Sequence, residues 1–164
     1  MSKKLQLNPK VSYLLGLYSA GDKAANYIGI KSTENEIIQK FIKYSMEELG
    51  IEPNKILIKE HEALFYNSKV KKLFEKALER RTKIFKYKNG YSANYFAGIF
   101  DICGGIDRKG LFLKMRDLSD ILVLENLGIH SREQGSKVYI SNQGALAGLI
   151  KEYSVIFDKL ISGS

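Results

Sequence analysis

Two segments of this sequence place basic and aromatic side chains on one face of a short strand and apolar side chains on the other. The first runs from residue 26 to residue 31, and the second runs from residue 111 to residue 116. Alternation with a period of two is typical of a strand with one buried face and one solvated face. Cations on a solvated sheet face favour a polyanionic partner. The solvated set is Tyr27, Lys31, Phe112, Lys114 and Arg116.

The composition of the whole chain also favours a polyanion. The 164 residues include 26 Lys and Arg against 18 Asp and Glu, which gives a net charge of +8. Lysine enrichment also occurs in heat-adapted proteins and in biased genomes, so charge alone does not establish nucleic-acid binding. One cysteine and two histidines are too few for a structural zinc site, and a single cysteine has no partner for an internal disulfide.

Hydropathy predicts a globular protein. Hydrophobic residues make up 45% of the chain, and no apolar stretch approaches the roughly 20 residues that span a bilayer. We therefore expect no membrane partner and an intracellular location, in the cytoplasm or at the nucleoid.

An internal repeat organises the sequence. The segment Leu14–Asp22 reappears in altered form as Phe96–Gly104, and the two starts lie 82 residues apart. Each copy is an apolar helical run with small residues on one side, and each reaches a glycine at or next to its last position. The order of elements is helix, strand, helix, two strands and helix, with the motif in the first helix, and the second half follows this order more tersely. The sequence therefore predicts a tandem duplication, with residues 1–88 and 89–164 as its two halves.

The expected elements follow from capping residues and periodicity. In the first half they are a helix from Asn8-Pro9 to Gly21, a strand over 26–31, a helix ending at Gly50, strands over 55–58 and 63–66, and a helix capped by Ser68. In the second half they are a helix capped by Ser92, a strand over 111–116, a helix from Ser119, a strand over 137–141 and one final helix through Leu160. Residues 145–150 resemble the repeated motif, but we interpret them as part of that final core-facing helix.

With its two motifs and the matching order of elements, the chain resembles the LAGLIDADG homing endonuclease family in its single-chain form. The resemblance implies an α+β fold of two pseudo-symmetric αββαββα-like halves in a monomer. It also implies that the two motif helices lie side by side, with Gly16 and Ala20 against Ala97 and Gly98. Two antiparallel sheets would then form a saddle over the major groove of DNA.

The resemblance also identifies the positions at which the family's nuclease chemistry takes place. Members carry an acidic residue at the eighth position of each motif, and the two carboxylates hold divalent metal. Those positions are Gly21 and Cys103 here, and neither supplies a hard oxygen ligand. Asp22 lies one residue later, while Asp101 and Asp107 are the nearby acids of the second half. These two departures from the family pattern therefore predict no metal site, no cofactor and no cleavage. Two alternatives remain: an active or nicking endonuclease that uses Asp22 with Mg²⁺, and an RNA-binding, maturase-like protein.

In this family the solvent-facing side chains of the sheets read the bases, and lysines and arginines hold the phosphates. Double-stranded DNA is therefore the expected partner. Carried onto this chain, the nucleic-acid-binding set is Tyr27, Lys31, Lys55, Lys59, His61, Phe112, Lys114, Arg116, Arg132, Lys137 and Tyr139. Two further basic stretches, residues 69–72 and 80–88, are either solvated or in contact with flanking phosphates.

Overall fold

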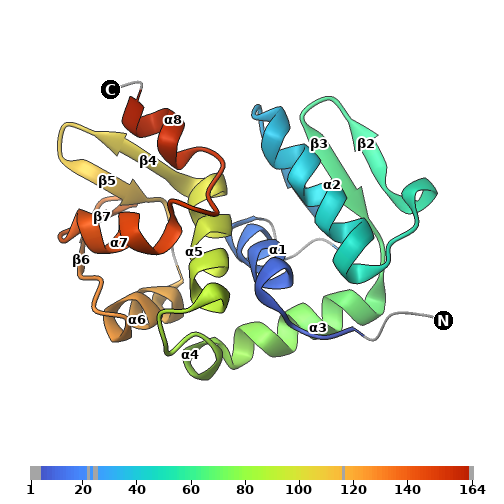
Figure 1. The fold of residues 1–164 in the computed structure, drawn as a ribbon, viewed down its shortest axis with the longest axis horizontal. Coiled ribbons are helices and arrows are strands. Elements are labelled where there is room, and N and C mark those ends of the chain that lie inside the picture. Colours follow the sequence, from blue (N-terminus) through green and yellow to red (C-terminus); the bar gives the residue numbers. More distant parts are fainter. Residues whose placement is uncertain (1–4, 22, 24–25, 116, 163–164) are drawn as a thin grey trace.

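Two helices lie side by side at the centre of the molecule (Figure 1). The structure is a computed structural model, and it describes residues 5–21, 23, 26–115 and 117–162. The helices are α1 (Pro9–Ala20) and α5 (Gly90–Cys103). The side chain of Asn8 caps α1 by accepting a hydrogen bond from the backbone N–H of Val11 at 2.8 Å. Asn89 caps α5 and forms a capping box with Ser92, so this helix begins before the expected cap.

The absence of side chains at Gly16 and Gly98 allows the two helices to touch. A Cβ atom at Gly16 would lie 2.0 Å from the carbonyl oxygen of Tyr95, and one at Gly98 would lie 2.3 Å from that of Tyr13. The Cα atom of Gly16 is itself 3.1 Å from the same added Cβ of Gly98. The two backbones are therefore in direct contact, and the predicted adjacency of the motif helices is confirmed.

A three-stranded antiparallel sheet follows α1 and packs against α2. The strand order is β1-β3-β2, with Gly29 opposite Leu64 and Leu64 opposite Leu57. Gly50 ends α2 in the left-handed conformation (φ 68°), as predicted. Asn67, one residue before the predicted Ser68, caps α3. The bounds are β1 (Ile28–Lys31), α2 (Asn35–Leu49), the 3₁₀ turn η1 (Pro53–Lys55), β2 (Leu57–Lys59), β3 (Glu62–Phe65), α3 (Ser68–Glu79) and α4 (Arg81–Ile84).

A four-stranded antiparallel sheet follows α5, in the order β4-β5-β7-β6. The hairpin of β4 and β5 was not predicted as such, because residues 104–107 contain two glycines and lack an apolar alternation. The bounds are β4 (Gly104–Asp107), β5 (Gly110–Leu113), α6 (Leu118–Asn126), β6 (Ser131–Gln134), β7 (Lys137–Ile140), α7 (Gln143–Ile150) and α8 (Phe157–Ser162).

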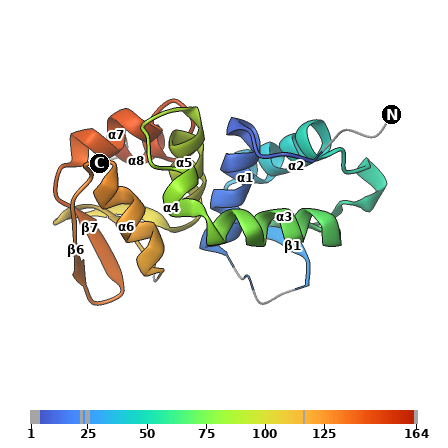
Figure 2. The same ribbon diagram turned by 90° about the horizontal axis from the view of Figure 1, so that it is seen from below.

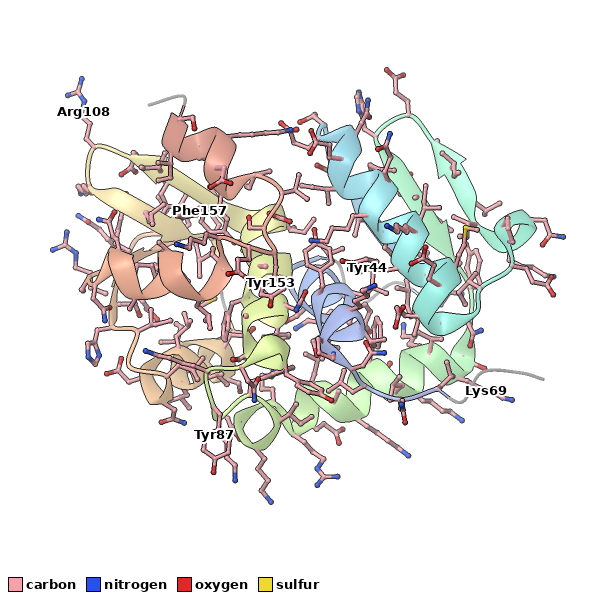
Figure 3. All side chains as sticks on the ribbon, viewed as in Figure 1. Tyr44, Lys69, Tyr87, Arg108, Tyr153 and Phe157 are labelled. Carbon is pink, nitrogen blue, oxygen red and sulfur yellow. The ribbon has the colours of Figure 1, made fainter. Side chains whose placement is uncertain are left out.

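The single final helix predicted from the sequence is in fact two helices, α7 and α8. The intervening segment turns because the buried carboxylate of Asp101 binds it. Asp101 accepts hydrogen bonds from the Ser154 hydroxyl at 2.6 Å and from the backbone N–H groups of Val155 and Ile156 at 3.0 and 3.2 Å. The hydroxyl of Tyr13 donates to the same carboxylate at 2.5 Å. One acid thus connects α1, α5 and the C-terminal segment, where Tyr153 lies close to α5 (Figure 3).

One hydrophobic core runs through both groups of elements, from Val11 to Phe157. Figure 2 shows α2, α7 and α8 on one side of the molecule, while β1, β6 and β7 extend toward the other. We call the surfaces of the two sheets that face away from this core the outer sheet faces. The structure is α+β with two antiparallel sheets, as predicted. Within the described residues, no helix is long and apolar enough to cross a membrane.

Candidate nucleic-acid interface

The ends of the two central helices meet at one hollow. Gly21 follows the last turn of α1, Cys103 is the last residue of α5, and both line a hollow of about 640 Å³. These are the two positions that correspond to each other in the repeated motif. The other residues that line the hollow are Ser19, Ala20, Lys23, Ile99, Lys114, Met115, Asp117, Leu118 and Asp120.

The thiol of Cys103 is neutral in this position. Burial raises the pKa of Cys103 to about 12, and the Sγ atom donates a hydrogen bond to the carbonyl oxygen of Ile99 at 3.1 Å. Metals bind the thiolate and not the thiol, and Mg²⁺ prefers oxygen ligands. Gly21 offers no side chain. The two eighth positions therefore provide no ligand for Mg²⁺, and Asp22 lies outside the described residues.

Two other carboxylates in the hollow are already bound to a cation. Arg81 places its Nη1 atom 2.9 Å from Asp117 Oδ2 and 3.0 Å from Asp120 Oδ2. Asp120 also accepts a hydrogen bond from the Tyr95 hydroxyl at 2.6 Å, and Lys23 lies 3.6 Å from Asp117. These contacts neutralise both acids. Among the described residues, no group of three or more His, Cys, Asp or Glu side chains is placed to hold a metal ion.

On the outer face of the first sheet, a charged row crosses all three strands. Lys31 of β1 and Lys59 of β2 both lie opposite Glu62 of β3, and Lys31 Nζ is 3.9 Å from Glu62 Oε2. The side chain of Lys31 is 76% exposed, so it can exchange this contact for a phosphate. The remaining predicted residues lie at the margins of the sheet. Tyr27 precedes β1 and packs edge-on against Tyr66, Lys55 belongs to η1, and His61 occupies the turn after β2 beside Glu60.

On the outer face of the second sheet, two aromatic rings pack against each other, and one of them packs against a glycine. Gly105, Phe112, Tyr139 and Arg132 form a row across four strands. A Cβ atom at Gly105 would lie 2.4 Å from the Phe112 ring. Phe112 and Tyr139 were expected to be solvent-facing, but they are only 7% and 6% exposed. Their rings contact each other, with centroids 5.8 Å apart, so each covers the other.

The carboxylate of Asp107 binds both a lysine and a tyrosine hydroxyl of this second face. It accepts a hydrogen bond from the Tyr139 hydroxyl at 2.6 Å and another from Lys137 Nζ at 3.0 Å. These two bonds hold the pKa of the Asp107 carboxyl at about 2. Lys137 Nζ also sits 4.3 Å from the centre of the Phe112 ring. From the sequence, Asp107 was only one of the nearby acids of the second half. The sequence Asp-Arg-Lys-Gly at 107–110 is typical of a turn, and this could have predicted that Asp107 lies at the end of a hairpin.

Lys114 connects the second sheet to the hollow at the helix ends. Its backbone N–H donates to the carbonyl oxygen of Cys103 at 2.8 Å, and its side chain lines the same hollow. Arg132 is exposed on β6, whereas Arg116 lies outside the described residues. The structure thus brings Lys31 and Lys59 together on one sheet. It brings Phe112, Lys137, Tyr139 and Arg132 together on the other.

Comparison with known proteins gives a likeness of structure and none of sequence. No protein-family model and no curated protein matches this sequence. Among solved structures, a variant of I-DmoI in complex with its target DNA and Mn has a TM-score of 0.65 at 16% identity, over 88% of this chain and 94% of that one. Variants of the homing endonuclease I-DmoI have a TM-score of 0.64 at 18% identity, over 88% of this chain and 96% of that one. A third structure, I-DmoI with DNA and Mn, has a TM-score of 0.62 at 18% identity, over 87% of this chain and 96% of that one. This chain therefore has the two-sheet α+β fold of the homing endonuclease I-DmoI.

Proposed function

We propose that this chain is a single-chain member of the LAGLIDADG homing endonuclease family that binds duplex DNA and does not cut it. Residues 1–88 and 89–164 are its two duplicated halves, and it acts as a monomer. The observation that supports DNA binding is the fold, because it resembles DNA-bound I-DmoI over nearly the whole chain. The outer sheet faces would lie against the duplex, with Lys59, Lys114 and Arg132 as exposed cations near its phosphates.

Loss of cleavage is inferred from the hollow at the helix ends. A two-metal mechanism needs hard anionic ligands on both sides of the scissile phosphates. Gly21 and the neutral thiol of Cys103 do not provide them, and Asp117 and Asp120 are already paired with Arg81 and Lys23. Asp22 is the remaining acid of the first motif. The nicking alternative therefore depends on Asp22 alone.

A binding experiment tests the first part of this proposal. Target sites are selected from a random duplex library with the purified chain, and affinity is then measured against salt concentration. Replacing Lys59 and Lys114 by glutamine should lower the slope of log K against log salt by about 0.9 for each phosphate that is no longer bound. The matched control replaces Lys43 and Lys151, two exposed lysines away from the outer sheet faces. Equal slopes for the two double variants would refute binding through the sheets.

A cleavage experiment tests the second part. The selected site is incubated with the chain and Mg²⁺ or Mn²⁺, and the products are resolved as nicked or fully cut duplex. We expect intact DNA. Double-strand cleavage would overturn the proposal, while nicking that disappears in Asp22→Ala would establish the nicking alternative. A parallel titration with structured RNA tests the maturase-like alternative, which requires tighter binding to RNA than to the selected duplex.

A further inference from the structure

The positive charge of this protein is concentrated in one segment. Residues 69–88 contain nine Lys and Arg against two Glu, a net charge of +7 out of +8 for the whole chain. The other 144 residues, which include both sheets, are therefore close to neutral. Since long-range attraction of a polyanion follows the net local charge, this segment should dominate that attraction.

Four of these nine cations lie on the solvent side of α3 and at its C-terminal cap. The helix buries Val70, Phe74, Ala77 and Leu78 in the core. The four cations are spaced three, four and four residues apart, which places them in one row on the opposite side of the helix. All four are exposed. We call this row the α3 basic face, and it consists of Lys69, Lys72, Lys76 and Arg80.

The α3 basic face has no ion pairs within the described part of the chain. The salt bridges there involve other cations, among them Lys31, Arg81, Lys137 and Lys159. Two cations of the sheets, Lys31 and Lys137, do each have a carboxylate partner. A cation without a partner gives up no internal contact when it binds a phosphate.

The position of α3 separates this row from the outer sheet faces. In Figure 1, α3 runs along one long edge of the molecule and leads through α4 to α5. Figure 2 places it in front, at a level between α2 and β1. Figure 3 shows Lys69 near one end of this edge and Tyr87 near the other, both pointing outward. A ligand on this edge would lie beside the sheets and not over them.

We propose that the α3 basic face is a second DNA-binding surface, which holds the phosphate backbone of a duplex segment other than the one on the sheets. A helix rises about 1.5 Å per residue, so the row from Lys69 to Arg80 extends about 17 Å. One DNA strand carries a phosphate about every 3.4 Å along the duplex axis, so the row matches roughly five consecutive phosphates.

Duplex DNA fits this surface better than single strands or RNA. Single-stranded ligands need aromatic platforms for their bases, and the exposed side of α3 has none between Lys69 and Arg80. Recognition of an RNA duplex uses its 2′-hydroxyl groups as well as its phosphates, so it does not depend on cations alone. After Ser68 at its first position, the exposed side of α3 and its cap carries lysines, Arg80, Glu75 and Glu79, a set suited to sequence-independent phosphate contacts.

The test compares two triple variants with the same change in net charge. The first replaces Lys69, Lys72 and Lys76 by glutamine. The matched control replaces Lys10, Lys43 and Lys151, three exposed lysines outside both surfaces. Equal melting temperatures for wild type and both variants establish that each is folded. The probe is a 12-base-pair duplex of arbitrary sequence, titrated at low salt while the number of duplexes per chain is measured.

We expect two duplexes per chain for wild type and for the control, and one for the α3 variant. The salt slope of the binding event that disappears should correspond to about four phosphates, one for each cation of the row, which is roughly 3.6. Identical stoichiometry and slope for the two triple variants would overturn the proposal. Loss of binding to an RNA hairpin with unchanged DNA binding would also overturn it, because RNA would then be the occupant.

DNA binding by the α3 basic face does not depend on DNA binding by the sheets, and the same titration distinguishes the two. The double variant Lys59→Gln with Lys114→Gln should lose the other duplex and keep the one on α3. If the sheets do not bind DNA, that double variant behaves like wild type while the α3 variant still loses a duplex. If the α3 basic face does not bind, only the sheet variant changes.

Discussion

Gly98→Ala is the substitution for which the structure gives the most definite expectation. A Cβ atom there would lie 2.3 Å from the Tyr13 carbonyl oxygen, 2.9 Å from the Leu17 nitrogen and 3.1 Å from Gly16 Cα. All three neighbours are backbone atoms of α1, so no side chain can rotate away. Ordinary contact begins near 3.4 Å, which requires α1 and α5 to separate by about 1 Å. Overpacking of this kind costs about 1–3 kcal/mol.

A second effect of the same substitution has the opposite sign. Alanine favours a helix over glycine by about 1 kcal/mol, so the net destabilisation should be about 0–2 kcal/mol. The matched control is Gly148→Ala in α7, where an added Cβ meets nothing within 4 Å. That variant should be stabilised by up to about 1 kcal/mol. Urea unfolding gives the change in the free energy of unfolding for each variant. Both variants gain the same helix propensity, so the difference between the two changes reports the overpacking alone and should be about 1–3 kcal/mol. Equal midpoints for the two variants would refute the close packing of α1 and α5.

Three further predictions concern buried or paired charges. Burial lowers the pKa of Lys40 to about 8 from 10.5, so the unfolded chain binds more protons between these values and the free energy of unfolding rises with pH across that window. Urea unfolding should show that the free energy of unfolding of wild type rises, relative to that of Lys40→Met, by up to about 3 kcal/mol between about pH 7.5 and pH 10.5. Parallel pH profiles of the two proteins would contradict this. Asp101→Asn should cost about 2–4 kcal/mol in the same assay, because a buried amide cannot accept from all the donors that the carboxylate binds; wild-type stability would contradict it. The hydrogen bond to Asp107 raises the pKa of Tyr139, so Asp107→Asn should lower that pKa in an NMR titration of the tyrosine rings, and an unchanged value would contradict the hydrogen bond.

The sequence was most informative where a pattern is local or repeated. Gly16 and Gly98 occupy the same place in two motifs, and the structure places them against each other. Gly50 ends α2 as its position predicted, because a left-handed helix end needs a residue without Cβ. The one-sided strands also followed from periodicity, since Ile28, Ile30, Leu111 and Leu113 all lie in the core.

The features that the sequence did not predict depend on contacts between distant residues. The final helix breaks because Ser154 and Val155 bind Asp101, which is more than fifty positions away in the chain. Phe112 and Tyr139 are buried because they lie side by side on neighbouring strands. The pairing of Lys137 with Asp107 likewise arises only when the hairpin of β4 and β5 meets β7. Periodicity describes which face a side chain takes, and it contains no information about what covers that face.

The two motif ends differ in how readily an acid could be introduced. At Gly21 an added Cβ would meet only the carbonyl oxygens of Leu17 and Tyr18, at 3.4 and 3.8 Å, and φ is −95°. Gly21→Asp is therefore compatible with the local packing. At Cys103 the thiol donates to the Ile99 carbonyl oxygen, so a carboxylate in its place would face an acceptor in a buried position, which raises its pKa. In calorimetric titrations, Gly21→Asp should accordingly bind Mn²⁺ at a lower metal concentration than Cys103→Asp. Binding by Cys103→Asp alone would show that the second motif end is more open than the structure indicates.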